Sequence, residues 1–153
     1  MQYSSVSATA LLAEDRASLS ETEASICTPY VLTIDDDEAI VDVIQFLLET
    51  EGYNGIGISD SLKVPAFLNS LKDDSLPSVI LLDLMMPGLS GYEIASALSQ
   101  NERYQHIPII IMTADSRVQG SNGIRGAIDF VPKPFHLDPL LAKLKAYLDP
   151  PSS

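Results

Sequence analysis

Short apolar runs alternate with amphipathic segments along most of this chain. The five runs are rich in β-branched and aliphatic residues and span 30–34, 54–58, 78–82, 107–112 and 128–131. Between them, apolar residues recur at the spacing of a helix, as in Ile40, Val41, Ile44, Leu47 and Leu48. Continuous apolar strands that alternate with helices indicate a parallel sheet covered on both faces. We therefore predict an α/β fold, with a doubly wound five-stranded parallel sheet of order 2-1-3-4-5 and five helices.

The pattern occupies one domain-sized stretch of the 153 residues. We expect a flexible N-terminal arm over 1–28, a single domain over 29–149 and a short tail over 150–153, with no output domain attached. No apolar run approaches the roughly 20 residues that a membrane-spanning helix needs, and residues 1–16 lack the basic start of a secretory signal. Together with the single cysteine, Cys27, this predicts a cytoplasmic protein with no membrane partner.

The charge balance is strongly acidic. The formal net charge is −12, from 9 basic and 21 acidic residues. Such a surface repels a phosphate backbone, so we expect no nucleic-acid partner. Part of this negative charge is concentrated where the predicted strands end, in a pattern that suits a cation site.

Polar side chains follow four of the five predicted strands. Asp35 and Asp36 end the first strand, Asp83 the third, Thr113 the fourth and Lys133 the fifth. In a doubly wound sheet the ligand site lies beyond the carboxyl ends of the strands, so these side chains should converge. Three carboxylates within about 4–6 Å repel one another by roughly 4 kcal/mol per close pair at an effective dielectric near 20. A few hard oxygen ligands of this kind suit Mg²⁺, and the sequence places no His or Cys for zinc.

Each of these residues also has a local structural explanation. For Asp37 we favour helix capping over metal binding, because Asp at an N-cap accepts hydrogen bonds from free backbone N–H groups. Taken alone, Asp83 is compatible with turn chemistry, Thr113 with an N-cap and Lys133 with a solvated loop. Asp35 and Asp36 cannot both be caps, since one cap suffices. The coincidence of all these residues at one sheet edge favours a phosphoryl-transfer site, in which an Asp beside Mg²⁺ is the nucleophile.

Four separated motifs carry a family resemblance, in the order VLTIDDDEAI, VILLDLMMPGLSG, IPIIIMTA and GAIDFVPKPF. Over roughly 30–148 the chain resembles the receiver domain of two-component response regulators, of the stand-alone type, which has a flavodoxin-like fold. The resemblance implies that Asp83 is the phosphoacceptor. It implies that Asp36 and Asp83 bind Mg²⁺ directly, that Asp35 does so largely through water, and that the Met85 carbonyl is a further ligand.

The resemblance also implies roles for the later motifs. Thr113 is expected to bond a phosphoryl oxygen after transfer, and Lys133 to pair with the phosphate. The Lys133–Pro134 peptide is expected to be cis. Phe130 matches the aromatic residue that turns inward on activation, although a half-buried strand aromatic would look the same in sequence.

The function implied is that of a phosphorylated signalling switch, not an enzyme beyond weak autophosphorylation and autophosphatase activity. Its partners would be a sensor histidine kinase or a histidine phosphotransfer protein, and a downstream protein target. One alternative is a pseudo-receiver, which binds proteins without phosphorylation. A more distant one is a haloacid-dehalogenase-type phosphatase, which requires a second Asp two residues after the nucleophile, where this chain has Met85.

The chain departs from the family pattern between Asp115 and Arg125. The spacing from Thr113 to Phe130 is about two residues short, and 120–123 reads Gly-Ser-Asn-Gly, which is poor helix material. We therefore expect the fourth helix to be short, irregular or mobile. Met85 cannot position an attacking water through a polar side chain, which predicts slow self-dephosphorylation.

Overall fold

Five parallel strands form the centre of the computed structural model, which describes residues 28–115, 117, 118, 120 and 123–149. The strands are β1 (Tyr30–Ile34), β2 (Asn54–Ile58), β3 (Val79–Asp83), β4 (Ile109–Thr113) and β5 (Ala127–Pro132). Their order in the sheet is β2-β1-β3-β4-β5, and every neighbouring pair is parallel. The predicted α/β class and strand order are confirmed.

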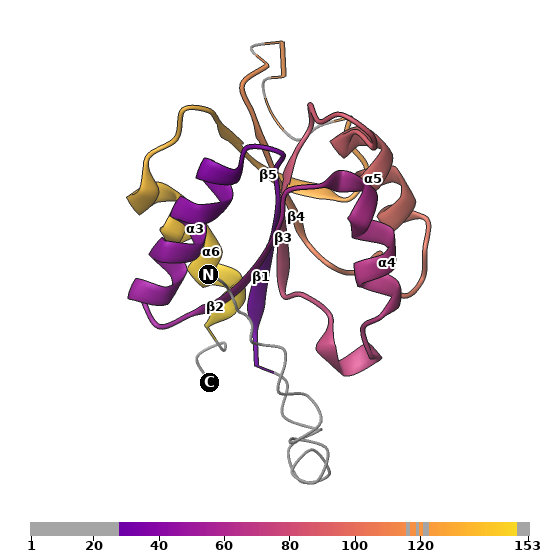
Figure 1. Ribbon diagram of the computed structural model, residues 1–153, viewed down its shortest axis with the longest axis horizontal. Coiled ribbons are helices and arrows are strands. Elements are labelled where there is room, and N and C mark those ends of the chain that lie inside the picture. Colours follow the sequence, from indigo (N-terminus) through magenta and orange to yellow (C-terminus); the bar gives the residue numbers. More distant parts are fainter. Residues whose placement is uncertain (1–27, 116, 119, 121–122, 150–153) are drawn as a thin grey trace, which may run out of the picture.

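Helices cover both faces of the sheet, which is seen nearly edge-on in Figure 1. The helices α3 (Glu38–Thr50) and α6 (Leu137–Leu148) lie on one face, and α4 (Val64–Asn69) and α5 (Gly91–Ser99) lie on the other. Alternate residues of β1, β3 and β4 enter one of two apolar clusters; Leu32 faces the α4–α5 side and Val31 the α3–α6 side. Strands buried on both faces explain the unbroken apolar runs of the sequence.

Two helices on the site side of the molecule begin with side-chain caps. The Asp37 carboxylate accepts a hydrogen bond from Ala39 N at 3.0 Å and caps α3, as predicted for this residue. Ser90 and Glu93 form a reciprocal capping box at the start of α5. These caps satisfy backbone N–H groups that a helix start leaves free, and they fix where the loops after β1 and β3 end.

The predicted number of helices was wrong for the described part of the chain, which has four α-helices and two short 3-10 turns, Ser61–Lys63 and Asp73–Ser75. The missing helix is the one expected between β4 and β5, where the described residues form turns and bends. Gly123 and Gly126 adopt φ values of +88° and +80° there. A right-handed helix cannot continue through that conformation.

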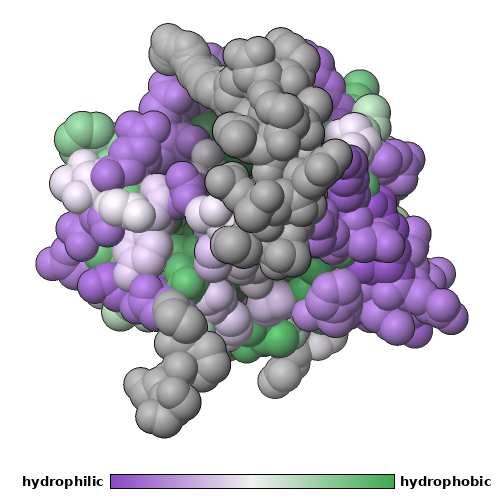
Figure 2. Space-filling view, turned by 90° about the horizontal axis from the view of Figure 1, so that it is seen from below, coloured by the Kyte–Doolittle hydropathy of each residue, from purple (hydrophilic) through white to green (hydrophobic). Residues whose placement is uncertain are grey.

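The two ends of the sheet differ in character. The strands finish beside the loops at the top of Figure 1, and they begin at the end shown in Figure 2, whose visible surface is mostly hydrophilic with separate green areas. Among the described residues, no helix is long and apolar enough to span a bilayer. The predicted arm over 1–28, apart from Thr28, and the tail over 150–153 lie outside the described residues.

Candidate functional site

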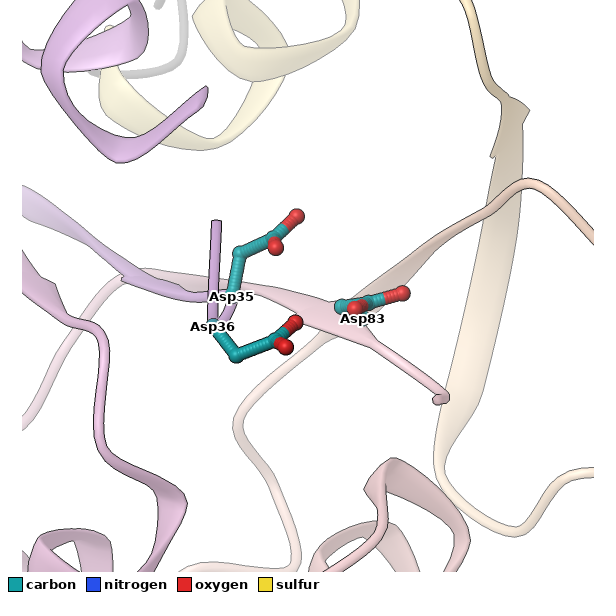
Figure 3. Close-up of side chains that lie close together, drawn as sticks. All are labelled: Asp35, Asp36 and Asp83. Atoms are coloured by element: carbon teal, nitrogen blue, oxygen red, sulfur yellow. The ribbon is translucent and has the colours of Figure 1, made fainter. Parts of the chain in front are cut away.

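The parallel sheet brings three carboxylates together at the ends of β1 and β3. Asp35 and Asp36 follow β1, Asp83 is the last residue of β3, and Figure 3 shows the three side chains gathered at this edge. One carboxylate oxygen from each residue lies within 4.8 Å of the others. Asp35 and Asp83 are buried and Asp36 is exposed, so the group opens to solvent on one side.

Lys133 lies between the two buried carboxylates. Its Nζ is 2.7 Å from Asp35 Oδ2 and 3.5 Å from Asp83 Oδ1. The backbone positions it: Lys133 N donates to Thr113 O at 2.9 Å, and the Lys133–Pro134 peptide is cis, as expected. The solvated-loop explanation of Lys133 is therefore wrong, because this side chain is only 14% exposed and ion-paired.

The electrostatics of Asp83 follow from its surroundings. Burial, as the largest cause, and the charges of Asp35 and Asp36 raise the pKa of Asp83, whereas Lys133 and the Met85 backbone N–H lower it, and the net result is a pKa of about 6. Near neutral pH the Asp83 carboxyl group is still mostly ionised, in a place where the charge is poorly compensated. Three carboxylates beside one ammonium leave an excess of two negative charges, which a divalent cation with oxygen preference would balance.

The loop after Asp83 is tightly constrained. A Cβ at Gly91 would meet the Asp83 carbonyl oxygen at 2.2 Å, so only glycine fits there, and Gly91 N donates to Leu84 O at 2.9 Å. Ser61 ties the loop to the 3-10 turn before α4, since its hydroxyl donates to Pro87 O at 2.8 Å and accepts from Leu89 N at 2.9 Å. Sequence reasoning missed Ser61, because this contact joins residues 26 and 28 positions apart.

Thr113 lies at the end of β4, on the wall of the same cleft. Its hydroxyl accepts a hydrogen bond from Asp115 N at 3.1 Å and caps no helix among the described residues. Phe130 in β5 is half-buried against the α4–α5 cluster. The expected site residues thus come together at one sheet edge, except Phe130, which does not line the cleft and pairs with Ile111 further back along the sheet.

An open cleft of about 500 Å³ covers these groups. The cleft is lined by Asp35, Asp36, Asp83, Thr113 and Lys133, together with Met85, which is 56% exposed. Arg117 also lines the cleft and was missed by the sequence analysis; its spacing of two from Asp115 is the only local signal. The hydrogen bonds from Arg117 lower the pKa of the Asp115 carboxyl group to about 2.

Known proteins are similar to this chain in sequence. Residues 31–145 match the model of the response regulator receiver domain. The chain is 36% identical over 124 residues to the DNA-binding dual master transcriptional regulator RpaA of Synechocystis sp., covering 78% of this chain and 49% of RpaA. It is 38% identical over 122 residues to the phosphate regulon transcriptional regulatory protein PhoB of Pseudomonas aeruginosa, covering 77% of this chain and 51% of PhoB.

Solved structures agree with these matches. The receiver domain of the Francisella response regulator 1452 has a TM-score of 0.67 at 27% identity, covering 79% of this chain and 97% of that domain. The chemotaxis response regulator CheY4 of Vibrio cholerae has a TM-score of 0.68 at 26% identity, covering 79% of this chain and 99% of CheY4. The chain spans about half the length of the curated relatives named above. It belongs to the response regulator receiver domain family of two-component signalling.

Proposed function

We propose that this chain accepts a phosphoryl group on Asp83 from the phosphohistidine of a sensor histidine kinase or a histidine phosphotransfer protein, in a Mg²⁺-dependent reaction. The observation that carries the proposal is the placement of Asp83, buried beside Asp35 and Asp36 and 3.5 Å from Lys133 Nζ. A desolvated carboxylate at the floor of a cleft is accessible to a phosphorus atom from the open side and is shielded by protein on the other.

The transfer exchanges one bond to phosphorus for another. An Asp83 carboxylate oxygen attacks phosphorus, the O–P bond forms as the P–N bond of phosphohistidine breaks, and the imidazole nitrogen keeps the bonding pair and takes a proton. In the separate hydrolysis step, a water oxygen bonds to phosphorus as the bond from phosphorus to the Asp83 oxygen breaks; the Asp83 carboxylate leaves, the attacking water gives up a proton to solvent, and inorganic phosphate is released. The protein's contribution is positioning and charge, because the phosphoryl oxygens carry the developing negative charge.

The residues around Asp83 fit that task. Asp35, Asp36, Asp83 and the Met85 carbonyl would hold Mg²⁺, which supplies positive charge next to the phosphoryl oxygens. Lys133 supplies a second positive charge 3.5 Å from Asp83 Oδ1. The Thr113 hydroxyl, which now accepts from Asp115 N, can rotate to donate to a phosphoryl oxygen.

Rotation of the Thr113 side chain would start the conformational change of the switch. Phosphorylation adds about −1.5 to −2 charge and three acceptor oxygens, which attract the Thr113 hydroxyl and Lys133. Phe130 would then turn inward into the space beside Thr113 and change the surface around β5 and α6. The phosphoryl group thus favours one of two conformations, and a downstream protein reads the surface of that conformation.

The partners that we propose are proteins. RpaA is described as DNA-binding, but half of its length lies outside the match, and the net charge of −12 opposes contact of this chain with a phosphate backbone. We further propose a cytoplasmic location and no enzymatic role beyond weak autophosphorylation and autophosphatase activity. The haloacid-dehalogenase-type alternative is disfavoured by Met85 at the position of that family's second Asp.

A pseudo-receiver is the second candidate function. The irregular chain between β4 and β5 favours it, because the described residues there lack the helix from which the usual signalling surface is built. The charged groups around Asp83 favour the phosphoacceptor function instead.

Incubation with acetyl phosphate and Mg²⁺ separates the two functions. Phosphorylation would raise the intact mass by about 80 Da in the wild type and leave Asp83→Asn unchanged. A wild type that binds Mg²⁺ but gains no mass would refute the phosphoacceptor proposal and favour the pseudo-receiver.

A further inference from the structure

Two basic side chains line the cleft among the described residues, and they differ in accessibility. Lys133 is 14% exposed and its Nζ is 2.7 Å from Asp35 Oδ2. Arg117 is 83% exposed. An anion that enters from solvent therefore meets the Arg117 guanidinium first, whereas Lys133 is already paired at the floor.

A short turn holds Arg117 at the rim of the cleft. Asp115 accepts three hydrogen bonds from Arg117, from the backbone N and Nε at 2.9 Å each and from Nη2 at 2.8 Å. Asp115 N is itself bonded to Thr113 Oγ1, and Val118, whose N donates to Asp115 O at 3.1 Å, packs against the α4–α5 cluster. The turn is thus anchored to β4 at one end and to the core at the other.

The cleft opposes the entry of a phosphodonor. Five described carboxylates line it, those of Asp35, Asp36, Asp37, Asp83 and Asp115, against the two cations. This leaves an excess of three negative charges, or of one with a divalent cation bound, and a phosphoryl group brings about −1.5 to −2 more. The guanidinium is planar and can bind two phosphate oxygens side by side, and its ion-pair partner among the described residues, Asp115, lines the same cleft.

We propose that Arg117 captures the phosphoryl group of the incoming donor, exchanging Asp115 for phosphoryl oxygens before transfer to Asp83. This inference rests on the proposed function. Arg117 forms no covalent bond: the Asp83 oxygen bonds to phosphorus as the bond to the donor breaks, and the guanidinium only holds the group in place. Arg117 therefore controls the capture of the donor and is dispensable for the attack itself.

The test measures phosphorylation of the full chain by acetyl phosphate, by intact mass over time, at saturating Mg²⁺ and several donor concentrations and ionic strengths. Arg117→Gln should lower kcat/KM by about tenfold, mainly through a higher KM, since one charge-assisted pair is lost. The phosphorylation rate of Arg117→Gln should also change less with ionic strength than that of the wild type. Arg117→Lys keeps the positive charge but loses the planar guanidinium. Its rate should therefore keep the salt dependence of the wild type, and its kcat/KM should fall by only about two- to fivefold.

Arg125→Gln is the matched control, because Arg125 is exposed in the same inter-strand segment and does not line the cleft. It removes the same charge, and its kcat/KM should stay within about twofold of the wild type. An Arg117→Gln protein that gains mass with wild-type rate and salt dependence would overturn the role of Arg117 and leave the phosphoacceptor function standing. An Arg125→Gln protein whose kcat/KM falls as far as that of Arg117→Gln would also overturn the role of Arg117 and leave the phosphoacceptor function standing. A wild type that gains no mass would overturn both. If Arg117→Gln does not fold, Arg117→Lys decides, since an unchanged rate there refutes recognition by the planar guanidinium.

Discussion

Replacing Asp83, the proposed phosphoacceptor, should stabilise the metal-free protein. In Asp83→Asn, a neutral side chain of nearly the same shape takes the place of a buried carboxylate beside Asp35. The wild type must fold with that carboxylate ionised near neutral pH, at a site where burial first and the Asp35 charge second disfavour ionisation. We therefore expect Asp83→Asn to raise the free energy of unfolding in the absence of Mg²⁺.

The size of the effect follows from the pKa of Asp83, which rises from 3.8 to about 6 on folding. A shift of roughly 2 units corresponds to about 3 kcal/mol. Because the folded state holds the proton more tightly, the stability from a protonated Asp83 is fully present below pH about 3.8 and is lost as the pH rises through about 6. The advantage of Asn is therefore about 3 kcal/mol near pH 7.5, but only about 1 kcal/mol near pH 4.5.

Urea unfolding in EDTA, at about pH 7.5 and about pH 4.5, measures this difference. Asp42→Asn is the control, because it removes the same charge from an exposed position on α3 and should change stability by less than about 0.5 kcal/mol. Adding Mg²⁺ should stabilise the wild type and not Asp83→Asn, which narrows the gap. If Asp83→Asn is no more stable than the wild type near pH 7.5, or if the gap is equal at both pH values, the electrostatic reasoning fails.

Four further predictions concern single residues of the site. Lys133→Gln leaves buried Asp35 without its cation and should lower the metal-free free energy of unfolding by about 3 kcal/mol in urea titrations; a loss below about 1 kcal/mol would contradict the pairing. Gly91→Ala places a methyl group against the Asp83 carbonyl oxygen and should destabilise by at least about 2 kcal/mol in the same assay, so an unchanged urea midpoint would refute the close approach. Asp37→Ala should lower the free energy of unfolding by about 1 kcal/mol, whereas Asp37→Asn should leave it almost unchanged, because Asn also caps helices. A slow phosphorylation rate in Asp37→Asn would instead indicate that Asp37 is a metal ligand. Finally, phospho-Asp83 should decay over minutes or longer in mass measurements, since exposed Met85 cannot hydrogen-bond an attacking water, and decay within seconds would disprove this.

The sequence alone determined the order of strands and helices and the edge at which the polar residues gather. Apolar runs with helical repeats between them leave few choices except a parallel sheet, and parallel strands end at a common edge. Five polar residues could therefore be assigned to one site from their positions at the ends of strands: Asp35, Asp36, Asp83, Thr113 and Lys133. Capping of α3 by Asp37 was equally predictable, because a cap depends on residues within one turn of each other.

Other properties were decided by the tertiary structure. Lys133 lies closer to Asp35 than to Asp83, and the pKa of Asp83 is raised. Both properties depend on burial and on distances across three strands, which no local sequence pattern records. Between β4 and β5 the described residues form turns and bends, and Gly123 and Gly126 there adopt positive φ, a conformation that the composition permits but does not impose. The place of Arg117 at the cleft follows from that turn, because a side chain in an irregular segment is positioned by the contacts that anchor the segment and not by a periodic spacing.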